Sequence, residues 1–281
     1  MRIALTGGTG LVGHFLLAGA LAAGDRVTLL SRRDPGLPGV AHLPYDLAGA
    51  VPDLSGQDVL IHAALAHEAG RYRGGEGDDA AGFVRRNRDG TLRLFDAALS
   101  GGLRRLVLLS SRAVLDGYPP GSRLPDGLPA RPRTLYGQVK AEAEAAAAAS
   151  GIGTSLRATG IYGPAPAGRA HKWHALFRDF AAGAEIAPRV GTEVHGGDLA
   201  AALRLILDQP APLPVYNLSD IVLDRHDLLA AWARVSGATG RLPPRADPRT
   251  VSVLDCAALR GLGWRPRGMA GLEPALAEMR D

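Results

Sequence analysis

A tyrosine and a lysine four positions apart form the pattern in this sequence with the clearest chemical potential. The segment YGQVK places Tyr136 and Lys140 on one face of a helix, because residues i and i+4 lie one turn apart. A tyrosine hydroxyl has an ordinary pKa of about 10, and a neighbouring ammonium group stabilises its phenolate and lowers that pKa. Lys140 is one of only two lysines in the chain, the other being Lys172. The pair is therefore a candidate for acid–base catalysis.

A glycine-rich segment near the amino terminus predicts a site for the phosphates of a dinucleotide. TGGTGLVG follows a short apolar run and opens a segment of helical periodicity, which is the strand–turn–helix setting such a site needs. Glycine allows the tight turn and the close approach of the backbone, and the amino end of the helix favours an anion. The cofactor-binding residues expected in this loop are Gly7, Thr9, Gly10, Leu11, Val12 and Gly13.

The residues after the second apolar run bear on the choice between two dinucleotides. A site that prefers NAD carries an acidic residue about 20 positions after the glycines, where it accepts hydrogen bonds from the ribose. This chain reads Ser31, Arg32 and Arg33 there. A guanidinium group forms a bidentate pair with the 2′-phosphate of NADP. We therefore expect NADP, with Arg32 as its ligand; in the alternative, the cofactor is NAD and the arginines are ordinary solvated residues.

These residues need a parallel sheet to bring them together, and the hydrophobic pattern predicts one. Short apolar runs alternate with helical segments, which indicates an α/β fold, a doubly wound parallel (Rossmann) sheet with helices on both faces. Strands are expected at 2–5, 27–30, 58–64, 106–110, 154–159 and at VYNL. Helices are expected at 11–23, 80–99, 135–149 and 198–208. Loops near the ligand are expected at 70–79 and 116–133.

The alternation loosens past residue 160, which predicts a second, smaller region. We expect a dinucleotide-binding domain over 1–165, to which 192–218 return, and a C-terminal substrate-binding region made of 166–191 and 219–281. Ser110 and Ser111 end the run LVLLSS at the carboxyl edge of the predicted sheet, where such folds bind ligands. A hydroxyl there can donate to a substrate carbonyl, although serines at strand ends also form turns and caps.

Composition narrows the class of protein. The net charge is +4, but the 32 basic residues are spread among 28 acidic ones, so we expect no nucleic-acid partner. Cys256 is the single cysteine, which excludes an intramolecular disulfide and favours the reducing cytoplasm. No signal peptide and no apolar run of membrane-spanning length is visible, so no membrane partner is expected. His171 and His174 lie three positions apart, but the sequence places no third metal ligand near them, so we expect no bound metal.

Four segments together resemble a known family. TGGTGLVG, LVLLSS followed by AVL, YGQVK, and LRATGIYGP are similar to the extended short-chain dehydrogenase/reductases, the NAD-dependent epimerase/dehydratase family, over nearly the whole chain. The resemblance implies that Ser111 is the catalytic hydroxyl, beside Tyr136 and Lys140, and that Lys140 also orients the nicotinamide ribose. Further residues that it places around the cofactor are Asp46, Leu47, Ala63, Ala64 and Asn87. It also implies a homodimer formed through two helices of each subunit.

Two departures from the family pattern affect the choice of substrate. Members that bind nucleotide sugars typically carry an asparagine and an arginine for the diphosphate where this chain has Gly160 and Gly191. Arg189, Arg169 and Lys172 are nearby in sequence and are candidates to replace those contacts.

Three functions remain open, and for the two enzymatic ones we expect a small-molecule substrate that carries a carbonyl or hydroxyl group. We expect first a dehydrogenase/reductase that transfers hydride between a nicotinamide and a small or sugar-like substrate. The alternative is a nucleotide-sugar epimerase or dehydratase that retains NAD. A non-enzymatic dinucleotide sensor is less favoured, because the Tyr136–Lys140 pair is intact.

Overall fold

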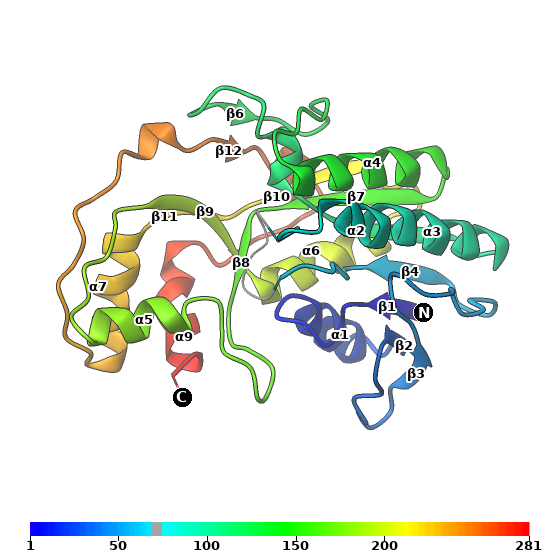
Figure 1. The fold of residues 1–281 in the computed structure, drawn as a ribbon, viewed down its shortest axis with the longest axis horizontal. Helices are drawn as coiled ribbons and strands as arrows, with labels where there is room; N and C mark the ends of the chain where they lie inside the picture. The colour runs from blue at the N-terminus through cyan, green and yellow to red at the C-terminus, as the bar shows by residue number, and fades with distance from the viewer. Residues whose placement is uncertain (69–74, 281) are drawn as a thin grey trace.

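A seven-stranded parallel sheet forms the centre of the computed structural model, which describes residues 1–68 and 75–280 (Figure 1). The first half of the predicted loop 70–79, residues 70–74, therefore lies outside the described residues. The strands in spatial order are β10 (Val215–Leu218), β7 (Gly153–Ala158), β5 (Arg105–Ser111), β4 (Val59–His62), β1 (Arg2–Thr6), β2 (Arg26–Ser31) and β3 (Ala41–Pro44). The predicted doubly wound fold is confirmed, and β3 is a strand that the apolar pattern did not predict.

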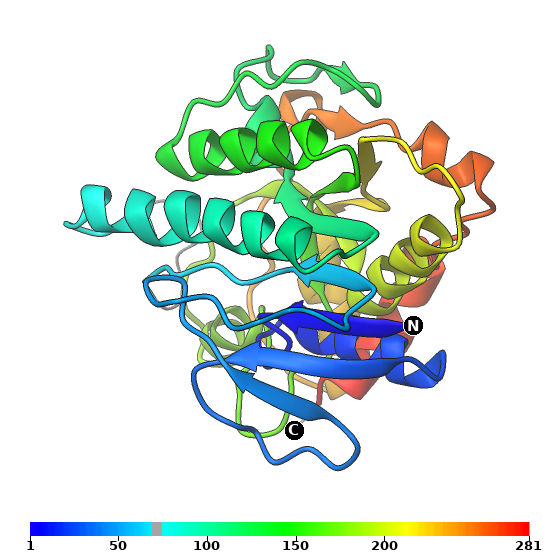
Figure 2. The ribbon, with the colours of Figure 1, turned by 90° about the vertical axis from the view of Figure 1, so that its right-hand side faces the viewer.

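Helices cover both faces of this sheet, as Figures 1 and 2 show. They are α1 (Gly13–Ala22) and α6 (Gly196–Leu207) on one face, and α3 (Gly90–Ser100) and α4 (Leu135–Ala149) on the other. Alternate residues of β1 enter the two cores: Ile3 and Leu5 pack with α1 and α6, and Ala4 packs with α3 and α4. Burial on both faces explains why the strands read as continuous apolar runs rather than alternating ones.

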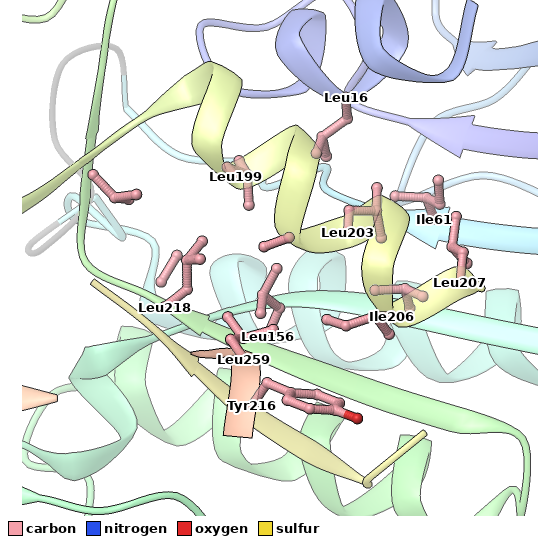
Figure 3. Packing of buried hydrophobic residues seen from close by; sticks show 14 of the residues in the cluster. Leu16, Ile61, Leu156, Leu199, Leu203, Ile206, Leu207, Tyr216, Leu218 and Leu259 are labelled. Carbon is pink, nitrogen blue, oxygen red and sulfur yellow. The ribbon is translucent and has the colours of Figure 1, made fainter. Parts of the chain in front are cut away.

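The contact between α1 and α6 is close because small residues line it. A Cβ on Gly19 would lie 2.9 Å from the Cβ of Ala200, so the two helices meet without an intervening side chain. Leu199 and Leu203 of α6 then lie between Leu16 of α1 and the strands beneath (Figure 3). This layer fixes the position of the glycine-rich loop, since α1 begins where that loop ends.

The helix predicted over 80–99 contains a wider turn. It consists of α2 (Ala80–Val84), a π-helical turn (Arg85–Asp89) and α3. The buried amide of Asn87 lies in that turn, where its Nδ2 donates to the carbonyl oxygens of Ala66 and Phe83 and its Oδ1 accepts from the backbone N–H of Ala66. Such turns occur often at functional sites, and here the turn fastens the helix to the segment after β4.

A smaller sheet and three helices form the second region, at the left in Figure 1. Its strands are β8 (Gly160–Tyr162), β9 (Val190–His195) and β11 (Ile221–Asp224), and its helices are α5 (His174–Ala181), α7 (Arg225–Ser236) and α9 (Leu272–Glu278). Residues 192–195, expected in the returning segment, lie in β9 of this sheet. The part that returns to the large sheet is α6 and β10.

The outer edge of β10 is closed by segments that are far apart in the sequence. The pieces are β6 (Arg123–Leu124) within the predicted loop 116–133, β12 (Val253–Leu254) and α8 (Ala257–Gly261). The outward backbone N–H of Asn217 donates to Asp126, and that of Ser219 donates to the sulfur of Cys256. Within the described residues, no helix is both long and apolar enough to cross a membrane.

Candidate active site

The glycine-rich loop lies against the segment that follows β4. Gly7 adopts a φ of +73°, and a Cβ on it would lie 2.8 Å from the carbonyl carbon of Ala63 and 2.8 Å from the nitrogen of Ala64. Any side chain at position 7 would separate the two backbones, and the left-handed conformation would strain it. The hydroxyl of Thr6 joins them further, since the N–H groups of Ala63 and Ala64 both donate to it. Gly7, Ala63 and Ala64 are thus brought together.

The start of α1 presents unused N–H groups beside this loop. A Cβ on Gly13 would overlap the carbonyl oxygen of Gly7, whose oxygen also accepts from the N–H of Gly10 at 2.9 Å. The helix has no side-chain cap at Val12, and within the described chain the N–H groups of Leu11 and Val12 have no protein acceptor. Half-buried Thr9 completes the turn. Backbone donors at a helix amino end fit a pyrophosphate, so the residues present fit the dinucleotide that the motif implies.

Arg32 and Arg33 are exposed directly after β2. Neither guanidinium has a side-chain partner among residues 1–68 and 75–280, and the Ser31 hydroxyl donates to the carbonyl of Arg33 at 2.8 Å. Both cations are therefore available to an anion at this edge of the sheet.

The two residues expected near the adenine lie in the loop after β3. The Asp46 carboxylate accepts from the N–H of Ala48 at 2.8 Å, and the Leu47 carbonyl accepts from Arg93 at 2.9 Å. A Cβ on Gly90 would overlap that same carbonyl, so the loop rests directly on the start of α3. Asp46 is exposed and Leu47 is buried.

His62 at the end of β4 is a buried structural residue. Its Nδ1 lies 2.8 Å from the hydroxyl of Thr6 and its Nε2 lies 2.9 Å from that of Thr91, which donates to the carbonyl of Asn87. Burial, together with the charge of Lys140, lowers the pKa of His62 to about 3. The neutral ring therefore links β1, β4 and the π-helical turn, and sequence reasoning missed this role.

His62 and His195 should make folding sensitive to mild acid. Burial, together with the charge of Arg267, lowers the pKa of His195 to about 4. Between about pH 6.5 and pH 4 the unfolded chain binds protons that the folded chain does not, so the free energy of unfolding falls as the pH falls. At pH 5 we expect a loss of about 2 kcal/mol for each histidine relative to pH 7, measurable by urea denaturation. His195→Asn should remove about half of that loss; a constant stability between those pH values would contradict the expectation.

The start of α4 brings Tyr136 to the end of β5. Thr134 caps the helix by accepting from the N–H of Gly137, and a Cβ on Gly137 would lie 2.6 Å from the carbonyl oxygen of Ala113. Ala113 lies two residues past Ser111, whose hydroxyl accepts from the Ala113 N–H at 3.2 Å. The close approach that glycine allows thus places half-buried Tyr136 beside the segment that carries Ser111.

Lys140 lies one turn further along α4 and is buried, with 6% of its surface exposed. Its Nζ donates to the carbonyl oxygen of Leu109 in β5 at 2.8 Å, which leaves two of its three N–H donors for other acceptors. Burial lowers the pKa of Lys140 to about 8, and the carboxylate of Glu144 acts in the opposite direction. The predicted pair therefore consists of a half-buried phenol and a buried ammonium group on neighbouring turns.

A buried charge network holds this helix to the sheet. Arg157 of β7 makes a bidentate contact with Glu144 of α4, with distances of 2.7 Å and 3.0 Å, and both side chains are almost fully buried. The Ser110 hydroxyl donates to Glu144 at 2.6 Å. Ser110 is thereby committed to the network, whereas the Ser111 hydroxyl accepts from the N–H of Ala113. Sequence reasoning did not predict the network, because its members are distant in the chain.

Comparison with known proteins identifies a family and one curated relative. The model of the NAD dependent epimerase/dehydratase family matches residues 3–219. A ketoreductase of Stigmatella aurantiaca that acts on 4-hydroxy-2-methyl-3-oxo-4-farnesyl-3,4-dihydroquinoline-1-oxide is 33% identical over an alignment of 159 residues, and the match covers 51% of this chain and 44% of that protein. The chain thus spans less than half the length of this curated relative.

Two solved structures share the fold over almost the whole chain. The UDP-glucose 4-epimerase of Thermus thermophilus in complex with NAD has a TM-score of 0.78 at 24% identity, over 99% of this chain and 98% of that one. The dTDP-glucose 4,6-dehydratase of Streptomyces venezuelae has a TM-score of 0.79 at 22% identity, over 98% and 96%. The family match covers the glycine-rich loop, Ser111 and the Tyr136–Lys140 pair, and the chain belongs to the NAD dependent epimerase/dehydratase family.

Proposed function

We propose that this protein is an NADPH-dependent ketoreductase. The observation that carries the proposal is at the end of β5: buried Lys140 donates to Leu109, two residues before Ser111, and the start of α4, which carries Tyr136, rests on Ala113, two residues after it. The ketoreductase activity of the relative from Stigmatella aurantiaca supports the same reaction class. The substrate-binding region is proposed to be the smaller sheet with α5, α7 and α9, which adjoins β7 through β8.

The residues of this chain have distinct parts in the proposed reaction. The loop from Gly7 to Gly13, with Ala63 and Ala64, would hold the dinucleotide, which when bound supplies hydride to the carbonyl carbon. Tyr136 donates its hydroxyl proton to the carbonyl oxygen as that oxygen gains negative charge. Ser111 donates a hydrogen bond to the same oxygen. Lys140 stabilises the phenolate that remains on Tyr136, and its free N–H donors can orient ribose hydroxyls.

NADP is the proposed cofactor because Arg32 and Arg33 are exposed and unpaired in the described chain, at the end of β2. Arg32→Ala should weaken NADPH binding by about tenfold to a hundredfold, the range of a lost charge-assisted hydrogen bond, and leave NADH binding unchanged. Fluorescence titration of the apo-protein measures both affinities. Arg26→Ala, which removes an exposed arginine at the other end of β2, should change neither. A wild-type protein that binds NADH as tightly as NADPH would contradict this prediction.

Turnover experiments separate a ketoreductase from an epimerase that retains its cofactor. A ketoreductase should consume NADPH in proportion to the alcohol that it forms, and the purified protein should exchange its dinucleotide freely. An epimerase should convert a nucleotide sugar with no net loss of NADPH absorbance and should retain bound dinucleotide through purification. The second pair of results would overturn the proposal in favour of the epimerase.

A further inference from the structure

The small sheet presents a face without side chains at two points. In the register of β8 and β9, Gly160 pairs with Glu193, and Gly191 lies on the same face as Glu193 because side chains alternate along a strand. A Cβ on Gly160 would overlap both the Glu193 carboxylate and the Lys172 ammonium group. A Cβ on Gly191 would lie 4.0 Å from Nη2 of Arg189. Charged groups from neighbouring positions therefore occupy or adjoin the space that the glycines leave.

This face lies close to the candidate catalytic residues. Ser111 pairs with Ala158 in the register of β5 and β7, and Gly160 follows Ala158 by two residues. Two residues of extended chain span roughly 7 Å and neighbouring strands lie about 4.8 Å apart, so the backbone at Gly160 lies roughly 8 to 9 Å from that at Ser111. A group on the reacting half of the substrate can therefore reach the Lys172–Glu193 pair.

This face of the small sheet carries more positive than negative charge. Glu193 is 9% exposed in its side chain and is ion-paired with Lys172, whose side chain is 29% exposed. Burial lowers the pKa of Lys172, the Glu193 carboxylate opposes that shift, and Arg189 adds to it. The Arg189 guanidinium is exposed and has no side-chain partner within the described residues. Arg225, whose pKa is lowered by burial and by Arg189, donates to the Ala187 carbonyl at 3.0 Å.

We propose that Lys172 and Arg189 bind a carboxylate of the substrate, with Glu193 holding Lys172 in the space left by Gly160. The substrate would then be an oxo acid. Two cations and one carboxylate leave a single positive charge in this group, which a monoanion neutralises. A nucleotide diphosphate carries more negative charge and would bring it against the buried Glu193 carboxylate. This substrate class rests on the proposed ketoreductase function; the anion site itself rests on the geometry of the small sheet.

Binding of a matched acid and ester to the NADP⁺-loaded protein tests the site without turnover. The probes are 5-oxohexanoate and its methyl ester, and the readout is intrinsic fluorescence, because the Lys172 ammonium lies 5.6 Å from the ring centroid of Trp173. We expect the acid to bind at least about tenfold more tightly than the ester. Arg189→Gln should remove most of that preference, since an exposed residue can be replaced without loss of the fold. Arg26→Gln, far from this face, should keep it.

A second variant, Gly160→Ala, and a third probe, UDP, test the same site. Gly160→Ala places a methyl group on the Lys172–Glu193 pair and should also reduce the preference for the acid, while NADPH still binds. Equal binding of acid and ester, including no binding of either, would overturn the inference, as would tighter binding of UDP that depends on Arg189. The ketoreductase proposal is judged separately by NADPH consumption: if the acid binds as expected but no oxo compound is reduced, the reaction is wrong and the anion site remains.

Discussion

Replacing Tyr136 with phenylalanine is expected to lower kcat by about 10²- to 10⁴-fold, the usual contribution of a positioned general acid. The phenylalanine ring fills the same space at the start of α4, so Gly137 still rests against Ala113 and the helix keeps its place. Lys140 remains bonded to the Leu109 carbonyl, and the glycine-rich loop is untouched. The variant removes the hydroxyl that is proposed to donate the proton. NADPH affinity should therefore stay the same while the rate of NADPH consumption in the presence of an oxo substrate falls.

Tyr118→Phe is the matched control for this prediction. Tyr118 lies seven residues after Ser111. Its hydroxyl donates to the Pro129 carbonyl at 3.0 Å, away from the proposed proton transfer. Its loss should change kcat by less than about fivefold, the effect of an exposed hydrogen bond of under about 1 kcal/mol. If Tyr136→Phe kept the activity of the wild type for every substrate, the protein would be better described as a dinucleotide-binding module without catalysis.

Arg157→Met should destabilise the fold by about 3–5 kcal/mol, because it leaves the Glu144 carboxylate buried without its cation. The Ser110 hydroxyl alone cannot balance that charge. Equilibrium unfolding in urea should show a lower midpoint with an unchanged slope. The change lies between α4 and β7, so the variant also removes support from the helix that carries Lys140.

Removing the unpaired carboxylate should restore most of the lost stability. In the double variant Glu144→Leu with Arg157→Met, both charged groups are replaced by apolar side chains of comparable size, an exchange that is often neutral in a buried site. The difference between the single and double variants isolates the cost of the unpaired charge. If Arg157→Met alone unfolded at the same urea concentration as the wild type, the ion pair would not contribute to the stability of the fold.

Local patterns in the sequence were enough to predict the sheet and several of its helices. The helix predicted at 135–149 is α4, and VYNL is β10, because a cap residue or a turn marks the ends of each. The strands that carry Thr6, Ser31 and Ser111 read as apolar runs buried on both faces. The candidate residues at the ends of those strands follow from the rule that parallel strands bring their carboxyl ends to one edge.

Contacts between distant residues could not be read from local patterns. Glu144 and Arg157 are 13 positions apart, and Lys172 and Glu193 are 21 apart, with no periodicity that links them. The π-helical turn also has no signal in the apolar spacing, since one wide turn changes the phase of a helix without changing its composition. The contacts of His62 with Thr6 and Thr91 likewise join residues that no local pattern links.

The closure of β10 has a consequence for how the chain matures. Its outward amides depend on Asp126 and Cys256, which lie 91 and 37 positions away, and β12 pairs with β6 across more than a hundred residues. During synthesis the ribosome delivers Asn217 and Ser219 well before Cys256, so for that interval the strand has an open side that can pair with another nascent chain. Chaperone demand and misassembly should therefore concentrate in the interval before residues 253–256 emerge.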